Sequence, residues 1–169
     1  MELINIRRSV RSYTDQKVEA EKVELLMKAA MQAPSAHNQQ AWEFYIVEDK
    51  ETLEKLSHYS PYSICVASAP MAIVVAGNKE KMVSPEYWQQ DLGAATQNIL
   101  LEAANIGLGG VWLACAPVED RMQNIKDMFG LDDNILPYCV ISVGYPKWEN
   151  AHKFKDRFNA ESVHYLDRK

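Results

Sequence analysis

The chain has 169 residues, a net charge of −5, a hydrophobic fraction of 47% and a charged fraction of 24%, which is typical of a globular protein. An acidic chain lacks the basic footprint of general nucleic-acid binding, so we expect no nucleic-acid partner. The sequence contains neither an apolar run of the roughly 18–20 residues that cross a bilayer nor a signal peptide, so we expect no membrane association and a cytoplasmic location. The length fits one domain, and we expect residues 1–169 to form it.

The hydrophobic pattern predicts helices and strands in an irregular order. In chain order we expect a helix over 19–32, a strand over 42–47, a short helix over 49–57, a strand over 71–76, a long helix over 86–106, a strand over 111–115, a helix over 118–129 and a strand over 138–143. The strand at 71–76 is continuously apolar, which predicts a central position in the sheet. The second half of the long helix is apolar over a wide arc, which is typical of a helix buried on more than one side.

Two patterns that could indicate binding sites instead predict structural features. The glycines at 107–110 follow a helix and enter a strand, the reverse of a dinucleotide-binding loop, so they predict a helix end and a turn. The cysteines, Cys65, Cys115 and Cys139, are odd in number and widely spaced, with no CxxC and no zinc-ligand spacing. We therefore expect reduced thiols and no metal site.

Three arginines, Arg7, Arg8 and Arg11, fall within five positions near the start of the chain. If the helix persists there, their i,i+3 and i,i+4 spacing brings them together on one ligand. Guanidinium groups bind phosphate oxygens two at a time, and Ser9 adds a hydroxyl donor, so a phosphate is the natural ligand. The alternatives are a solvated basic helix end and a surface that binds an acidic protein partner.

A polar loop at 33–40 lies between the first predicted helix and the first predicted strand. It is dense in side chains that both donate and accept hydrogen bonds, including Ser35, Asn38 and Gln40. Such groups suit a heterocycle with carbonyl and N–H edges. The alternative is an ordinary polar surface loop.

Four motifs in order resemble the nitroreductase family of FMN-dependent oxidoreductases: RRSVR at 7–11, APSAHNQQAW at 33–42, GLGGVW at 107–112, and GYP at 144–146 followed by a basic tail that ends RFNAESVHY. The resemblance covers the chain from Ile6 to Tyr165. It implies an α+β fold with a mixed, largely antiparallel β-sheet flanked by helices. It also implies an intertwined homodimer with FMN at the subunit interface and residues from both chains in each site.

The resemblance implies three groups of FMN contacts. The group at the phosphate and ribityl chain would be Arg7, Arg8, Ser9, Arg11, Lys155 and Arg157. The group contributed by the partner chain would be Pro34, Ser35, Asn38 and Gln40. The group alongside the isoalloxazine ring would be Trp112, Leu113 and Ala114.

The resemblance implies that FMN takes a hydride from NAD(P)H and passes reducing equivalents to a planar, electron-poor acceptor such as a nitroaromatic or quinone, in a ping-pong cycle. Because FMN performs this chemistry, the implied activity needs no catalytic side chain. His37 is a candidate substrate contact. Tyr87 and Trp88 are candidates for stacking on a flat substrate, although they equally fit a helix start that packs on the core. Three alternatives stay open: a same-fold flavoenzyme for dehalogenation or flavin breakdown, a low-turnover FMN-storage protein, and an interaction module without a cofactor.

Overall fold

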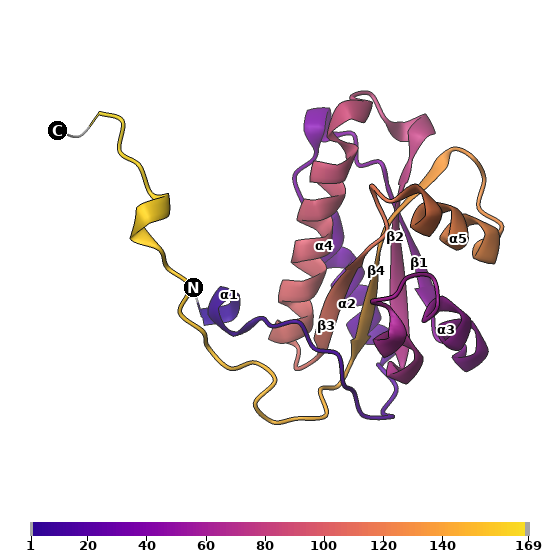
Figure 1. Ribbon diagram of the computed structural model, residues 1–169, viewed down its shortest axis with the longest axis horizontal. Helices are drawn as coiled ribbons and strands as arrows, with labels where there is room; N and C mark the ends of the chain where they lie inside the picture. Colours follow the sequence, from indigo (N-terminus) through magenta and orange to yellow (C-terminus); the bar gives the residue numbers. More distant parts are fainter. Residues whose placement is uncertain (1, 168–169) are drawn as a thin grey trace.

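The structure, a computed structural model, describes residues 2–167 and is an α+β arrangement of a four-stranded sheet between two layers of helices (Figure 1). The helices are α1 (Glu2–Ile6), α2 (Ala20–Met31), α3 (Lys50–Leu56), α4 (Trp88–Asn105) and α5 (Glu119–Phe129). The strands are β1 (Trp42–Val47), β2 (Met71–Asn78), β3 (Gly109–Ala114) and β4 (Ile135–Gly144). The strand order is β1-β2-β4-β3, and every neighbouring pair is antiparallel.

The central strand β2 is buried on both faces, as its apolar sequence predicts. Side chains alternate across a strand, so Ile73 and Val75 join one core with α2 and α4. Ala72 and Val74 join a second core with α3 and α5 on the opposite face. Because neither side of β2 meets water, burial of its apolar surface stabilises both layers at once.

The start of strand β4 differs from the sequence prediction. Strand β4 begins at Ile135, three residues before the expected start, and includes Pro137. A proline cannot donate a ladder hydrogen bond, and the register between β2 and β4 shifts between Val75 and Ala76, opposite this proline. The irregular pairing accommodates the proline, which a single-sequence pattern does not reveal.

The segment at 7–13 is extended, not helical, and it lies along β3. Helix α1 ends at Ile6, and the amide of Val10 donates to the Gly110 carbonyl at 3.0 Å. A Cβ at Gly109 would lie 2.6 Å from a methyl of Val10, so only glycine permits this close approach. The expectation that Arg7, Arg8 and Arg11 share a helix face is therefore wrong, because the helix ends before Arg7 and the backbone beyond it bonds to a strand.

The chain after β4 forms a long tail that runs past α1 and away from the helices and the sheet (Figure 1). Up to residue 167 it contains one short 3₁₀ turn, Ala160–Ser162, and most of these residues are exposed. Phe154 and Phe158 are 58% and 79% exposed. The tail therefore presents large apolar side chains that this chain does not cover.

Candidate functional site

Four basic side chains from opposite ends of the chain line one hollow of about 520 Å³. Arg7 and Arg8 come from the N-terminal segment, and Lys155 and Arg157 come from the tail. We call this hollow the basic pocket. Asp156 is its acidic lining residue, so positive charge exceeds negative charge there.

The basic pocket has unmatched positive charge and an unsatisfied donor. Burial, followed by the nearby charges of Arg8 and Arg157, lowers the pKa of Arg7. Arg8 donates from Nη1 to the Arg7 carbonyl at 2.6 Å, while its buried Nη2 has no partner within residues 2–167. No ion pair in that range involves Arg7, Arg8, Lys155 or Arg157. Buried donors are normally satisfied, so these side chains fit an anion with several acceptor oxygens, such as a phosphate.

Arg11 lies outside the basic pocket. It lines a second hollow of about 340 Å³ together with Trp112, Leu113 and Ala114 of β3, and we call this the strand hollow. Between the two hollows, Ser9 forms a parallel bridge with Gly110. An extended chain rises about 3.3 Å per residue, so roughly 13 Å of backbone separates Arg7 from Arg11. The arginines expected at one phosphate are therefore spread along β3.

The loop at 34–40 has a strained backbone. His37, Asn38 and Gln40 have φ angles of 51°, 53° and 47°, a region that residues other than glycine adopt uncommonly. Gln40 donates through its amide N–H to Ser35 Oγ at 3.1 Å and through Nε2 to Asn38 Oδ1 at 3.0 Å. These bonds hold the polar side chains in one arrangement. Neither the basic pocket nor the strand hollow is lined by Pro34, Ser35, His37, Asn38 or Gln40.

The residue that holds this loop, Asp91, was missed by the sequence analysis, which noted Gln39 only as one of the polar side chains of the loop. Gln39 Nε2 donates to Asp91 Oδ2 of α4 at 2.5 Å, and the Ala36 amide donates to Asp91 Oδ1 at 2.9 Å. Asp91 is buried, with only 5% of the residue exposed. The available signal was the position of Asp91, a lone carboxylate between Trp88 and an otherwise uncharged helical stretch that continues to residue 101.

Tyr87 and Trp88 occupy different surroundings. Tyr87 is 47% exposed, whereas Trp88 packs edge-on against Tyr138, with ring centroids 5.8 Å apart. Trp112 packs against the same tyrosine at 5.6 Å. The structure therefore places Trp88 in the aromatic packing at the start of α4, while Tyr87 keeps a face open.

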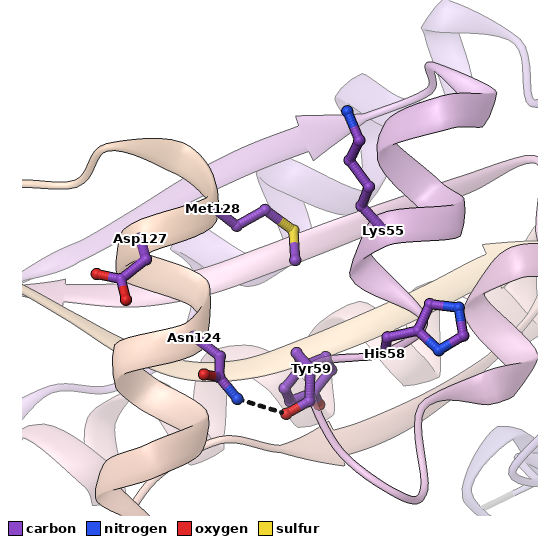
Figure 2. Close-up of a pocket in the computed structure, with 6 residues that line it drawn as sticks. All are labelled: Lys55, His58, Tyr59, Asn124, Asp127 and Met128. Carbon is purple, nitrogen blue, oxygen red and sulfur yellow. Dashed lines mark hydrogen bonds between the residues drawn. The ribbon is translucent and has the colours of Figure 1, made fainter.

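A third hollow, of about 540 Å³, lies between α3 and α5, where no sequence motif pointed (Figure 2). Its charged groups already have partners along their own helices. Lys55 pairs with Glu51 at 2.7 Å, and Asp127 accepts from Gln123 at 2.7 Å. Asn124 donates to the Tyr59 carbonyl at 3.3 Å (Figure 2). This hollow has no unmatched charge comparable to that of the basic pocket.

Metal ligands and thiols do not add to the site. The part of the chain that the structure describes contains no group of three His, Cys, Asp or Glu side chains arranged for a metal ion. Within the same residues, no helix is long and apolar enough to span a membrane. The cysteines are free, and burial raises the pKa of Cys115 to about 12 and raises that of Cys139 as well.

Comparison with known proteins defines the class. The family model of the nitroreductase family matches residues 4–61 and 60–145. An Archaeoglobus fulgidus protein named "Putative NADH dehydrogenase/NAD(P)H nitroreductase" is 41% identical over 166 residues, covering 97% of this chain and 95% of that protein. The chain belongs to the nitroreductase family.

Solved structures agree with this assignment. A Clostridium acetobutylicum protein titled "Putative NADH Oxidase" superposes with a TM-score of 0.94 at 53% identity, covering 99% of each chain. An FMN-dependent nitroreductase from Clostridium difficile superposes with a TM-score of 0.86 at 31% identity, again covering 99% of each chain. The fold class expected from the motifs is confirmed.

Proposed function

We propose that this chain is an NAD(P)H-dependent FMN oxidoreductase that reduces planar, electron-poor acceptors, such as nitroaromatics or quinones, in a ping-pong cycle. Membership of the nitroreductase family makes the chain an FMN-type oxidoreductase, and relatives named NAD(P)H nitroreductase and FMN reductase agree with this. The observation that carries the proposal is the basic pocket, which gathers four cations and one unsatisfied guanidinium N–H group.

The basic pocket and the strand hollow, which contain the two ends of the 7–11 segment, fit an elongated flavin nucleotide. In this proposal Arg7, Arg8, Lys155 and Arg157 bind the phosphate, and the unpartnered Nη2 of Arg8 donates to a phosphate oxygen. The extended segment then leads along β3 toward the strand hollow. Ser9 and Arg11 would follow the ribityl chain, and the ring would lie beside Trp112, Leu113 and Ala114.

When bound, FMN supplies the redox chemistry, taking a hydride from a nicotinamide and passing reducing equivalents to the acceptor. The side chains of this protein have other tasks: they bind the phosphate, orient the ring and offer hydrogen bonds to its polar edge. We assign no general base or nucleophile. His37 and Tyr87 are exposed and remain candidate substrate contacts, and Trp88 would act through packing.

We further propose a homodimer in which each site takes residues from both chains. The loop residues assigned to the partner's flavin line neither the basic pocket nor the strand hollow of their own chain, so in this proposal they contact the flavin of a second chain. They are Pro34, Ser35, Asn38 and Gln40. Phe154 and Phe158 of the tail are exposed beside the basic pocket. Large apolar side chains gathered in this way are typical of a surface covered by a partner.

The proposal is tested by initial-rate kinetics with NADH or NADPH and a nitroaromatic acceptor. Because donor and acceptor would use the same face in turn, double-reciprocal plots should give parallel lines. Intersecting lines, the mark of a ternary complex, would contradict the ping-pong cycle. Tight FMN binding with negligible NAD(P)H oxidation would favour the storage protein instead.

A further inference from the structure

Arg121 gives the strand hollow a second positive charge that the flavin proposal does not use. Arg121 lies in the first turn of α5, and its guanidinium carbon is 5.4 Å from the ring centroid of Tyr62. Its Nη1 donates to the Ala114 carbonyl at 3.3 Å. A guanidinium carries five N–H donors, so this one weak bond leaves most of them available to a ligand.

No carboxylate lines the strand hollow. Its lining residues other than Trp112, Leu113 and Ala114 of β3 are Arg11, Ser60, Tyr62 and Arg121. The acidic neighbours of Arg121 on α5, Glu119 and Asp120, line a different hollow beside Lys126 and Leu136. Within residues 2–167 neither Arg11 nor Arg121 forms an ion pair. The two guanidinium groups therefore lack a counter-ion.

We propose that Arg121, with Tyr62, binds an anionic substituent of the acceptor, so that the preferred acceptors are planar, electron-poor rings that carry a carboxylate or sulfonate. This inference rests on the proposed function, because the acceptor must stack on the flavin ring that is proposed to lie beside Trp112–Ala114. Guanidinium groups bind carboxylates in a bidentate manner and stack on aromatic rings at the same time.

The position of Tyr62 favours an aromatic acceptor, and not the phosphate of a dinucleotide, as the molecule whose anionic group Arg121 binds. The residue is 69% exposed, so it offers a flat ring next to the cation. An aromatic acid has the same arrangement of a flat ring with an anion at its edge. Arg11 is already assigned to the flavin, which leaves Arg121 as the specificity-determining charge.

The test compares two acceptors of similar shape, 4-nitrobenzoate and the neutral 4-nitrobenzamide, in the holoenzyme. The substitution is Arg121→Gln, and Lys28→Gln is the matched control, because Lys28 is exposed on α2 and loses the same unit charge. Loss of a charged hydrogen bond predicts about a tenfold or larger fall in kcat/KM for 4-nitrobenzoate with Arg121→Gln. We expect little change for the amide, and little change for either acceptor with Lys28→Gln. Arg121→Lys should retain part of the preference for the acid.

Two results would overturn the inference. One is an unchanged ratio of kcat/KM for the two acceptors in Arg121→Gln. The other is a selective loss of kcat/KM for NADPH relative to NADH, which would assign Arg121 to a donor phosphate.

A binding measurement separates this inference from the proposed function. Benzoate cannot be reduced by a nicotinamide, so its affinity for the purified protein can be measured by calorimetry without turnover. We expect Arg121→Gln to weaken benzoate binding about tenfold, while the melting temperature confirms folding. Equal benzoate affinity in both proteins would contradict the role of Arg121 even in an active enzyme. A different outcome would contradict the proposed function and leave the role of Arg121 intact. In it, Arg121→Gln weakens benzoate binding, but NAD(P)H does not reduce the flavin of the wild-type protein.

Discussion

The side-chain amide of Gln39 donates to the buried carboxylate of Asp91 at 2.5 Å, and this contact ties the loop at 34–40 to the first turn of α4. The other end of the Gln39 side chain accepts hydrogen bonds from the amides of Val83 and Ser84, both at 3.0 Å. One glutamine and one aspartate thus connect three segments of the chain. The strained backbone of the loop persists because these hydrogen bonds hold it against α4 and the segment at 83–84.

Asp91→Asn should destabilise the protein and loosen this loop. An asparagine can accept with only one side-chain oxygen, so either the Ala36 amide loses its acceptor or Gln39 Nε2 loses one of its two acceptors and keeps only the Ser84 carbonyl. An unsatisfied buried donor costs about 1–3 kcal/mol, and the thermal midpoint should fall accordingly. Asp120→Asn, an exposed site on α5, is the control. Equal stability of the Asp91 and Asp120 variants would show that the contact does not hold the loop.

Arg8→Ala should weaken FMN binding about ten- to a hundredfold, because a charge-assisted hydrogen bond contributes about 1.5–3 kcal/mol. The affinity for riboflavin, which has no phosphate, should change much less. Both can be measured by fluorescence titration of the apoprotein, with Lys28→Ala as a control for net charge. An Arg8→Ala variant with wild-type FMN affinity would remove the phosphate assignment.

Sedimentation of the FMN-bound protein should give twice the mass of one chain. The exposed Phe154 and Phe158 predict that the tail contributes to the contact, so Phe158→Ser should shift the equilibrium toward monomer and reduce FMN affinity together. Ile64→Ser is the control: Ile64 is 65% exposed and lies away from the basic pocket, so this variant tests whether any loss of exposed apolar surface has the same effect. A stable monomer that retains FMN would rule out the shared site.

The buried thiols predict how stability depends on pH. Burial raises the pKa of Cys115 to about 12, above the roughly 8.5 of an unfolded cysteine, and raises the pKa of Cys139 in the same direction. The unfolded chain therefore loses these protons first, and the free energy of unfolding should fall as pH rises from about 8.5 toward 12. Urea unfolding at pH 7 and pH 9.5 measures this change.

Thiol labelling checks the same assignment independently of unfolding energies. At pH 8 an aromatic disulfide reagent should modify the half-buried Cys65 in the native protein, and Cys115 and Cys139 only after unfolding. Rapid modification of all three native cysteines would show that the two buried thiols are accessible.

The regular elements could be predicted from the sequence because each carries its own periodicity. The continuous apolar run of β2 indicated a central strand, and Gly107, with a φ of 80°, ends α4 in a turn as expected. The N-terminal segment could not be predicted in this way, because its conformation depends on β3, about a hundred residues away. The local sequence at 7–11 is compatible with a helix, whereas the hydrogen bond from the Val10 amide to the Gly110 carbonyl holds the chain extended.

The site was predictable only in part for the same reason. The pairing of Arg7 and Arg8 with Lys155 and Arg157 joins both ends of the chain, and only the family resemblance suggested it. Arg121 and Asp91 carry no local motif, so their roles depend on which segments meet in space.

The most direct test of the proposed function is the absorbance spectrum of the purified protein under anaerobic conditions. A flavin spectrum should be present as isolated, and one equivalent of NADH or NADPH per site should bleach it, with colour restored by a nitroaromatic acceptor. A colourless protein that does not take up FMN would contradict the assignment of the basic pocket. A yellow protein that neither nicotinamide bleaches would contradict the reductase.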